Sequence, residues 1–138
     1  MANFISRTLK PEIYHGYNQA APFFEGWYFK LVSPDGNSRL AVIPGVFLGE
    51  NGHAFIQVLD GTARDSDYVS FPLADFWASQ DDFDIRIGDN SFNTHGFSLD
   101  IKTSIGRIKG MVNFDNTVPW PVTLTSPGIM GWYAWVPR

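Results

Sequence analysis

The sequence predicts an all-β protein in which an antiparallel meander forms a β-barrel or half-barrel with little helix. Short segments of alternating apolar and polar residues recur along the 138-residue chain, as expected of antiparallel strands with one buried face. Turn-forming residues such as Asp-Gly separate these segments, and no long segment shows a helical period. Aromatic residues make up 16% of the chain and charged residues 17%, a balance that favours a barrel enclosing an apolar cavity.

The N-terminal half contains four predicted strands that follow an irregular arm. The arm covers residues 1–22, because Pro11, Gly16 and Pro22 interrupt any regular pattern there. A turn is predicted at residues 33–37, where proline and Asp-Gly suit the corners. The predicted strands are residues 24–32, residues 39–43 resuming at 46–48 after Pro44-Gly45, residues 53–59 and residues 67–72.

The C-terminal half continues the meander and ends in a segment of different composition. Residues 73–78 fit either a strand or one helical turn, and we favour the strand. Further strands are predicted at residues 82–87, 97–101 and 108–114. The tail, residues 118–138, is rich in proline and tryptophan, and a last strand is predicted at residues 130–136. Residues 1–138 are expected to form a single barrel-like domain.

Composition limits the partners of the protein. The net charge is −4, the isoelectric point is near 5.1 and no run of Lys or Arg occurs, so nucleic acid is not an expected partner. The chain has no cysteine, which excludes disulfides and thiolate chemistry. No segment has the apolar length of a signal peptide or a membrane-spanning helix. We therefore expect a soluble cytoplasmic protein, with peripheral contact to a membrane left open.

The segment FFEGWYFK, residues 23–30, places one carboxylate and one ammonium group in an aromatic strand. Alternation along a strand puts Phe23, Glu25, Trp27 and Phe29 on one face and Phe24, Gly26, Tyr28 and Lys30 on the other. A carboxylate in apolar surroundings either finds hydrogen-bonding partners or has its pKa raised until it is protonated. Glu25 is therefore a candidate proton donor, and the alternative is a structural contact with Lys30, Arg39 or a backbone donor.

FFEGWYFK resembles the tocopherol cyclase family, in its bacterial branch. The resemblance extends to Tyr14-His15-Gly16, to HAFIQVLDG from His53 and to PWPVTLTSPGIMGWYAWVP from Pro119. It implies a fold similar to the lipocalins and calycins, built from two related β-barrel halves, of which this chain is the N-terminal one. It also implies an intramolecular lyase of the isomerase class that acts in vitamin E biosynthesis.

The reaction implied by the resemblance closes a prenylated hydroquinone into a chromanol. An acid protonates the alkene of the prenyl tail, the phenol oxygen attacks the resulting cation, and neither a metal nor another cofactor is required. Aromatic faces stabilise a cation, and a desolvated carboxylic acid stays protonated near neutral pH. Glu25 is thus the candidate catalytic residue. The candidate substrate-binding residues are Trp27, Phe29, His53, Gln57 and Trp132.

Three alternatives accompany these assignments. If the chain is not an enzyme, it is either a lipocalin-like module that binds hydrophobic ligands or a half-barrel that functions only with a partner chain. His15 and His53 are candidate proton shuttles, because histidine titrates near neutrality, although a structural or surface role is the commoner one. The aromatic tail forms part of the core, a cavity wall, or a surface for self-association or for docking a second half.

Overall fold

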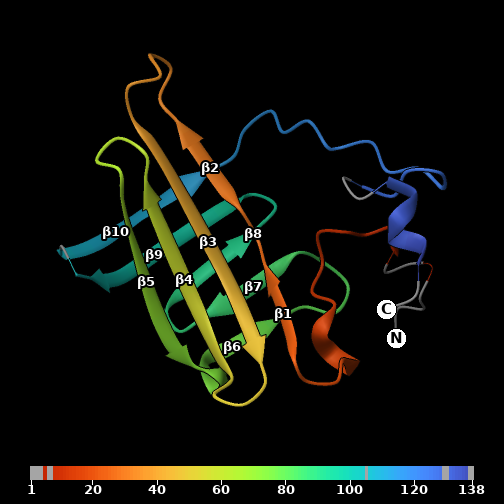
Figure 1. Cartoon of the computed structure of the whole chain (residues 1–138). Coiled ribbons are helices and arrows are strands. Elements are labelled where there is room, and N and C mark those ends of the chain that lie inside the picture. Colours follow the sequence, from red (N-terminus) through yellow and green to blue (C-terminus); the bar gives the residue numbers. More distant parts are fainter. Residues whose placement is uncertain (1–4, 6–7, 105, 129–130, 137–138) are drawn as a thin grey trace.

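The computed structural model describes residue 5 and residues 8–104, 106–128 and 131–136, and it is built from two antiparallel sheets (Figure 1). Sheet A has the strand order β1-β3-β4-β5, with β2 also paired to β3, and sheet B has the order β10-β9-β8-β7-β6. The predicted all-β, antiparallel fold class is confirmed. Among the described residues, hydrogen-bonded pairing does not pass from one sheet to the other, so the strands do not close into one barrel.

The strands follow the chain in a meander, with three short 3-10 helices among the described segments. The strands of sheet A are β1 (Phe23–Gly26), β2 (Phe29–Val32), β3 (Arg39–Leu48), β4 (His53–Asp60) and β5 (Asp65–Pro72). Those of sheet B are β6 (Phe76–Ala78), β7 (Asp84–Ile87), β8 (Asn90–Asn93), β9 (Gly96–Thr103) and β10 (Gly106–Asn113). The 3-10 helices are η1 (Gly16–Asn18), η2 (Leu73–Asp75) and η3 (Gly131–Trp135).

The predicted first strand is divided into β1 and β2 opposite Pro44. Both strands pair with β3 in one register, since Gly26 faces Gly45 and Phe29 faces Val42. Pro44 has no backbone N–H to donate, although its carbonyl oxygen still accepts the N–H of Trp27 at 2.9 Å. The expected interruption of β3 at Pro44 does not occur: β3 is continuous, and the break falls on its edge partner instead.

The core lies between the two sheets, as the alternation of the strands predicts. Sheet A contributes Val42, Val46, Ala54, Ile56 and Val58, and sheet B contributes Ile85, Ile87, Phe92, Phe97, Leu99 and Ile101. Phe29 fills the space between the sheets, where its ring packs against those of Phe83, Phe92, Phe97 and Phe114. Part of the aromatic excess of the sequence therefore goes into a packed interior, while other rings, such as Phe24 and Trp120, remain exposed.

Three local predictions need correction. Residues 73–78 divide into η2 and β6, so both alternatives weighed for this segment occur in sequence. The short strand β8 was not predicted, because it has four residues of mixed polarity. Residues 131–135 form η3 rather than a strand, and Gly131 has a φ of 56°; residues 129–130 lie outside the described residues. Within the described part of the chain, no helix is long and apolar enough to cross a membrane.

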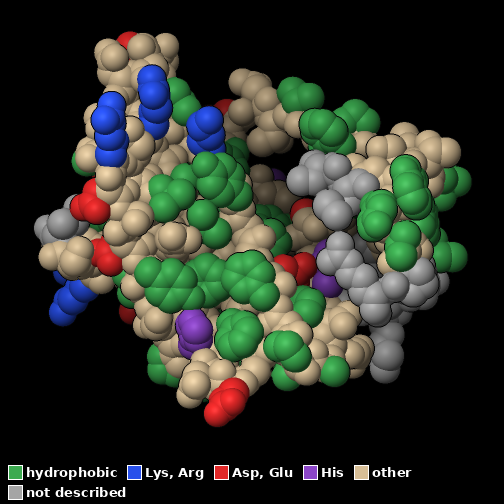
Figure 2. Space-filling view, viewed as in Figure 1, with side chains coloured by type: hydrophobic (Ala, Val, Ile, Leu, Met, Phe, Trp, Pro, Cys, Tyr) green, Lys and Arg blue, Asp and Glu red, His purple; other side chains and the backbone are tan. Residues whose placement is uncertain are grey.

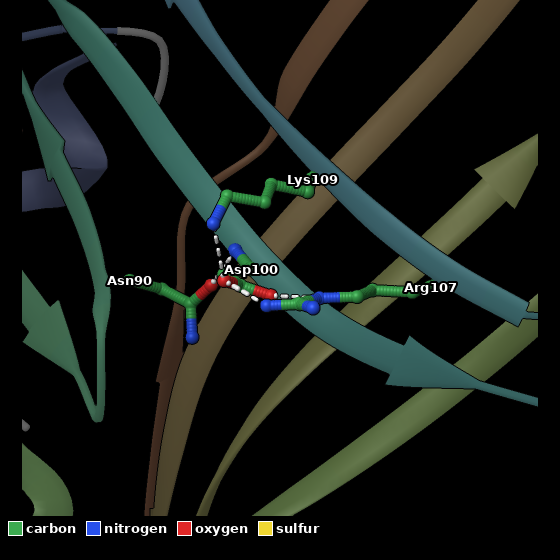
Figure 3. A network of polar contacts seen from close by, with 4 residues as sticks. All are labelled: Asn90, Asp100, Arg107 and Lys109. Atoms are coloured by element: carbon green, nitrogen blue, oxygen red, sulfur yellow. Dashed lines mark hydrogen bonds and ion pairs between the residues drawn. The ribbon is translucent and has the colours of Figure 1, made fainter.

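A polar network joins strands β8, β9 and β10 of sheet B (Figure 3). Arg107 donates from Nε and Nη2 to the two oxygens of Asp100, both at 2.6 Å, and Lys109 Nζ lies 3.2 Å from Oδ2. These contacts, with Arg107 first, lower the pKa of Asp100 to about 2. The buried amide of Asn90 accepts the backbone N–H of Asp100 at 2.7 Å and donates to the carbonyl of Ile87 at 2.9 Å.

Candidate functional site

A histidine from the N-terminal arm pairs with the candidate acid on β1. His15 Nδ1 lies 2.7 Å from Glu25 Oε1, and the backbone N–H of His15 donates to Oε2 at 2.8 Å. Glu25 thus finds hydrogen-bonding partners, including the predicted backbone donor, and its side-chain partner is His15 rather than Lys30 or Arg39. The side chains of His15 and Glu25 are 27% and 18% exposed, so solutes reach a pair that is partly desolvated.

Contacts elsewhere in the arm hold His15 against the sheets. Trp27 Nε1 donates to the carbonyl of Glu12 at 2.9 Å, just before the paired histidine. Just after it, the hydroxyl of Tyr17 donates to the carbonyl of Ala78 on β6. The arm is therefore fastened to sheet A on one side of His15 and to sheet B on the other, which fixes the position of the imidazole.

Aromatic rings surround the His15–Glu25 pair on the interior side. The ring of Tyr14 is buried and lies 6.2 Å from Phe23, 6.3 Å from Trp27 and 5.2 Å from Phe76, measured between centroids. Burial raises the pKa of the Tyr14 phenol to about 12, and the negative charge of Glu25 adds to this shift. Tyr14 is therefore neutral at ordinary pH.

The structure brings only part of the predicted site together. Glu25 and Trp27 lie on the interior side of the first edge of sheet A, as alternation predicts. Phe29 shares this side but is packed into the core, where its ring has no open face for a substrate. Its assignment as a substrate-binding residue is not favoured by this packing.

His53 and Gln57 lie on the opposite side of sheet A. Both alternate with the buried residues Ala54 and Ile56 on β4, so their side chains point away from Glu25. His53 Nδ1 lies 2.9 Å from the carbonyl oxygen of Asn51, and Nε2 lies 2.8 Å from the hydroxyl of Tyr68. These two candidates therefore cannot share one small substrate with Glu25 in this arrangement.

Two tryptophans of the tail lie outside the core, which was one of the three alternatives for this segment. Trp120 and Trp132 are 64% and 67% exposed, and the ring of Trp132 packs on Tyr133 with a centroid distance of 5.0 Å. Figure 1 shows the tail crossing from β10 to the side of the molecule where the N-terminal arm lies. There, a side chain added at Gly128 would meet Pro11.

An open cleft of about 710 Å³ lies at the turn end of the β2–β3 hairpin. Its walls include apolar Leu31, Leu40 and Phe114 and polar Lys30, Arg39, Asp60 and Thr62. Its described lining contains neither His15 nor Glu25, so the cleft and the His15–Glu25 pair are separate places on the sheet edge. In the described part of the chain, no three His, Cys, Asp or Glu side chains gather to form a metal site.

Sequence reasoning considered His15 as a proton shuttle but did not pair it with Glu25, and it missed the part played by Tyr14. The residues are ten or eleven positions from Glu25 in an irregular arm, where no periodic pattern indicates which side chains meet. The one available signal was the co-occurrence of Tyr14-His15-Gly16 with FFEGWYFK. Comparison with known proteins found no matching family model, no similar curated protein and no similar solved structure.

Proposed function

We propose that this protein is a tocopherol cyclase-like enzyme that cyclises a prenylated hydroquinone to a chromanol at the His15–Glu25 pair. The observation that carries the proposal is the 2.7 Å contact between His15 Nδ1 and Glu25 Oε1 beside the rings of Tyr14 and Trp27. A carboxylate and an imidazole in hydrogen-bond contact are the groups most used for general acid–base catalysis. The resemblance carried by FFEGWYFK supplies the substrate class.

The proposed reaction needs one proton, which the pair gives and regains. The proton shared between Glu25 and His15 moves to the less substituted carbon of the prenyl alkene, leaving a tertiary cation. The phenol oxygen attacks that cation and forms the new C–O bond. The phenolic proton then returns to the pair, so the bonds and charges balance without a redox step. The acid is therefore the pair as a unit rather than Glu25 alone.

The neighbouring rings have a separate role in the proposal. The face of Trp27, which is only partly buried, stabilises the developing cation by its quadrupole, and Tyr14 supports Trp27 from the core side. The neutral phenol of Tyr14 also avoids placing a second negative charge next to Glu25, because its pKa is about 12. A desolvated aromatic wall strengthens both effects, since electrostatic interactions increase when water is excluded.

Chromanol formation from a prenylated hydroquinone, followed by chromatography under anaerobic conditions, tests the proposal. We expect Glu25→Gln and His15→Gln to lower turnover by about 100-fold or more, which is the usual contribution of general acid–base catalysis. Glu12→Gln is the matched control, because the side chain of Glu12 is exposed and only its carbonyl holds Trp27. Absence of chromanol with the unaltered chain, or equal turnover by all variants, would contradict the proposal.

The cleft at the β2–β3 hairpin favours a second candidate function, non-catalytic binding of hydrophobic ligands. Leu31, Leu40 and Phe114 provide apolar walls in a cleft of about 710 Å³, which is within the size range of small-molecule sites. Under this alternative a prenylquinone binds and is recovered unchanged. Leu40→Asp should then weaken binding at least tenfold, whereas Glu25→Gln should leave it unaltered; the reverse pattern excludes the cleft as the binding site.

A further inference from the structure

The outward side of sheet A carries a cluster of ring side chains, which we call the aromatic face. It is formed by Phe24, Phe47, His53, Phe55 and Tyr68. The ring of Phe55 is stacked between those of Phe24 and Tyr68, with centroid distances of 5.7 and 4.9 Å. Figure 2 shows these strands from the front, with hydrophobic side chains gathered across the middle of the sheet and a histidine below them.

The aromatic face is rigid at its centre and exposed at its margins. Phe55 is only 3% exposed, whereas Phe24 is 64% and Tyr68 is 47% exposed. Tyr28, which follows β1 along the same edge, is 61% exposed. Three exposed aromatic rings therefore project from this side of sheet A, and burial of their apolar surface away from water would be favourable.

Charge is sorted between the two sides of sheet A. Alternation and pairing register place Lys30 and Arg39 on the outward side, opposite Ala41 and Val32 respectively. The carboxylates on the described strands of this sheet all alternate onto the interior side. They are Glu25, Asp60, Asp65 and Asp67. Among the charged strand residues of sheet A, the outward side therefore carries the cations, while Figure 2 also shows acidic side chains at the margins of this view. The chain as a whole has a net charge of −4.

We propose that the aromatic face docks on an anionic lipid bilayer. Aromatic side chains favour the boundary between headgroups and acyl chains, and neighbouring Lys and Arg are attracted to anionic headgroups. A bilayer accommodates rings spread over several strands, because each ring enters the interface independently. The cleft at the hairpin includes Lys30 and Arg39 but none of the five ring side chains of the aromatic face, so a single small molecule in the cleft does not account for the exposed rings. This surface is distinct from the His15–Glu25 pair, and the proposal does not rest on the proposed reaction.

Sedimentation with phosphatidylcholine vesicles, with and without about one third phosphatidylserine, tests the docking surface. We expect stronger binding to the anionic vesicles and loss of that preference at high salt, because exposed charges are then screened. Lys30→Gln should weaken binding about fivefold, the usual effect of one cation near an anionic surface. Lys102→Gln is its matched control, since Lys102 is an exposed cation on β9 of the other sheet.

The apolar contribution is tested by the exposed rings. Phe24→Ser combined with Tyr28→Ser should weaken vesicle binding at least tenfold, whereas Trp77→Ser should not, because Trp77 lies on β6 and is 48% exposed on the other sheet. Circular dichroism checks that each variant is folded. If the double variant does not fold, vesicle binding by Lys30→Gln still tests the proposal. Absence of vesicle binding, equal binding to both vesicle types, or equal loss in the controls would overturn the proposal. Self-association that Phe24→Ser abolishes, without vesicle binding, would assign the face to a second copy instead.

Discussion

His15 contacts both carboxylate oxygens of Glu25, one through its imidazole at 2.7 Å and the other through its backbone N–H at 2.8 Å. Two contacts from one residue fix the orientation of the carboxyl group and of the imidazole together. They also tie an irregular segment to the edge of sheet A, because Glu25 lies on β1 and His15 precedes η1. The candidate acid–base pair is therefore also a structural joint.

The contact between His15 and Glu25 should give a measurable coupling free energy between the two side chains. In a double-mutant cycle with His15→Ala and Glu25→Ala, followed by urea denaturation, we expect a coupling free energy of about 1–2 kcal/mol, as for neighbours that share a charge-assisted hydrogen bond. Glu12→Ala combined with His15→Ala is the control pair. A coupling indistinguishable from that control would show that the contact does not stabilise the fold.

Gly45 should be intolerant of any side chain. A Cβ added there would lie 2.2 Å from Cζ of Phe55 and 2.9 Å from the backbone oxygen of Glu25. We expect Gly45→Ala to lower the free energy of unfolding by roughly 1–3 kcal/mol, which is typical of overpacking. Gly110→Ala is the control, because no atom lies within 4 Å of the added Cβ. Equal stability of the two variants would contradict the packing of Phe55 over Gly45.

Stability should fall at alkaline pH because of Tyr14. Burial raises the folded-state pKa of the phenol to about 12, whereas an exposed tyrosine titrates near pH 10, so the unfolded chain loses its proton first. The stabilisation is complete below about pH 10 and is lost as pH rises towards about 12. Urea midpoints of the unaltered chain and of Tyr14→Phe should therefore converge as pH rises. Parallel curves would exclude this linkage. Burial also raises the pKa values of Tyr17 and Tyr68, and these two phenols account for any pH dependence that remains in Tyr14→Phe.

Asn90 should be the most sensitive member of the network in sheet B. It is 1% exposed, and its amide satisfies both the N–H of Asp100 and the carbonyl of Ile87. Removal of a buried partner leaves polar groups unpaired, so we expect Asn90→Ala to cost about 2–3 kcal/mol in urea denaturation. Asn93→Ala, which removes one exposed contact with the N–H of His95, should cost less than half as much. A similar cost for both would refute the special role of Asn90.

Local patterns in the sequence were enough to predict the all-β class and the side of the sheet on which Glu25 lies. Alternation along FFEGWYFK correctly separated Glu25 and Trp27 from Tyr28 and Lys30, because a strand leaves no other choice. The turn at residues 33–37 was predicted for a similar reason, and Gly36 donates to the carbonyl of Ser33 at 2.8 Å.

The parts that failed depend on contacts between distant segments. The pairing of His15 with Glu25 requires an irregular arm to fold back on β1, and no local rule specifies that path. Residues 131–135 have the aromatic composition of a strand, but they form the short helix η3. Trp132 was expected to line a cavity, yet composition alone does not show whether a ring meets the core or remains exposed.

The shared register of β1 and β2 on β3 has an electrostatic consequence. Because the Pro44 interruption neither adds nor removes a residue, one parity rule applies from Phe23 to Val32. A slip of one residue would exchange the two sides, placing Glu25 among the outward rings and Lys30 against the interior. The same error would remove the acid from its histidine and reverse the sign of the charge beside the aromatic face. Strand pairing in this protein is thus also a means of separating positive from negative charge.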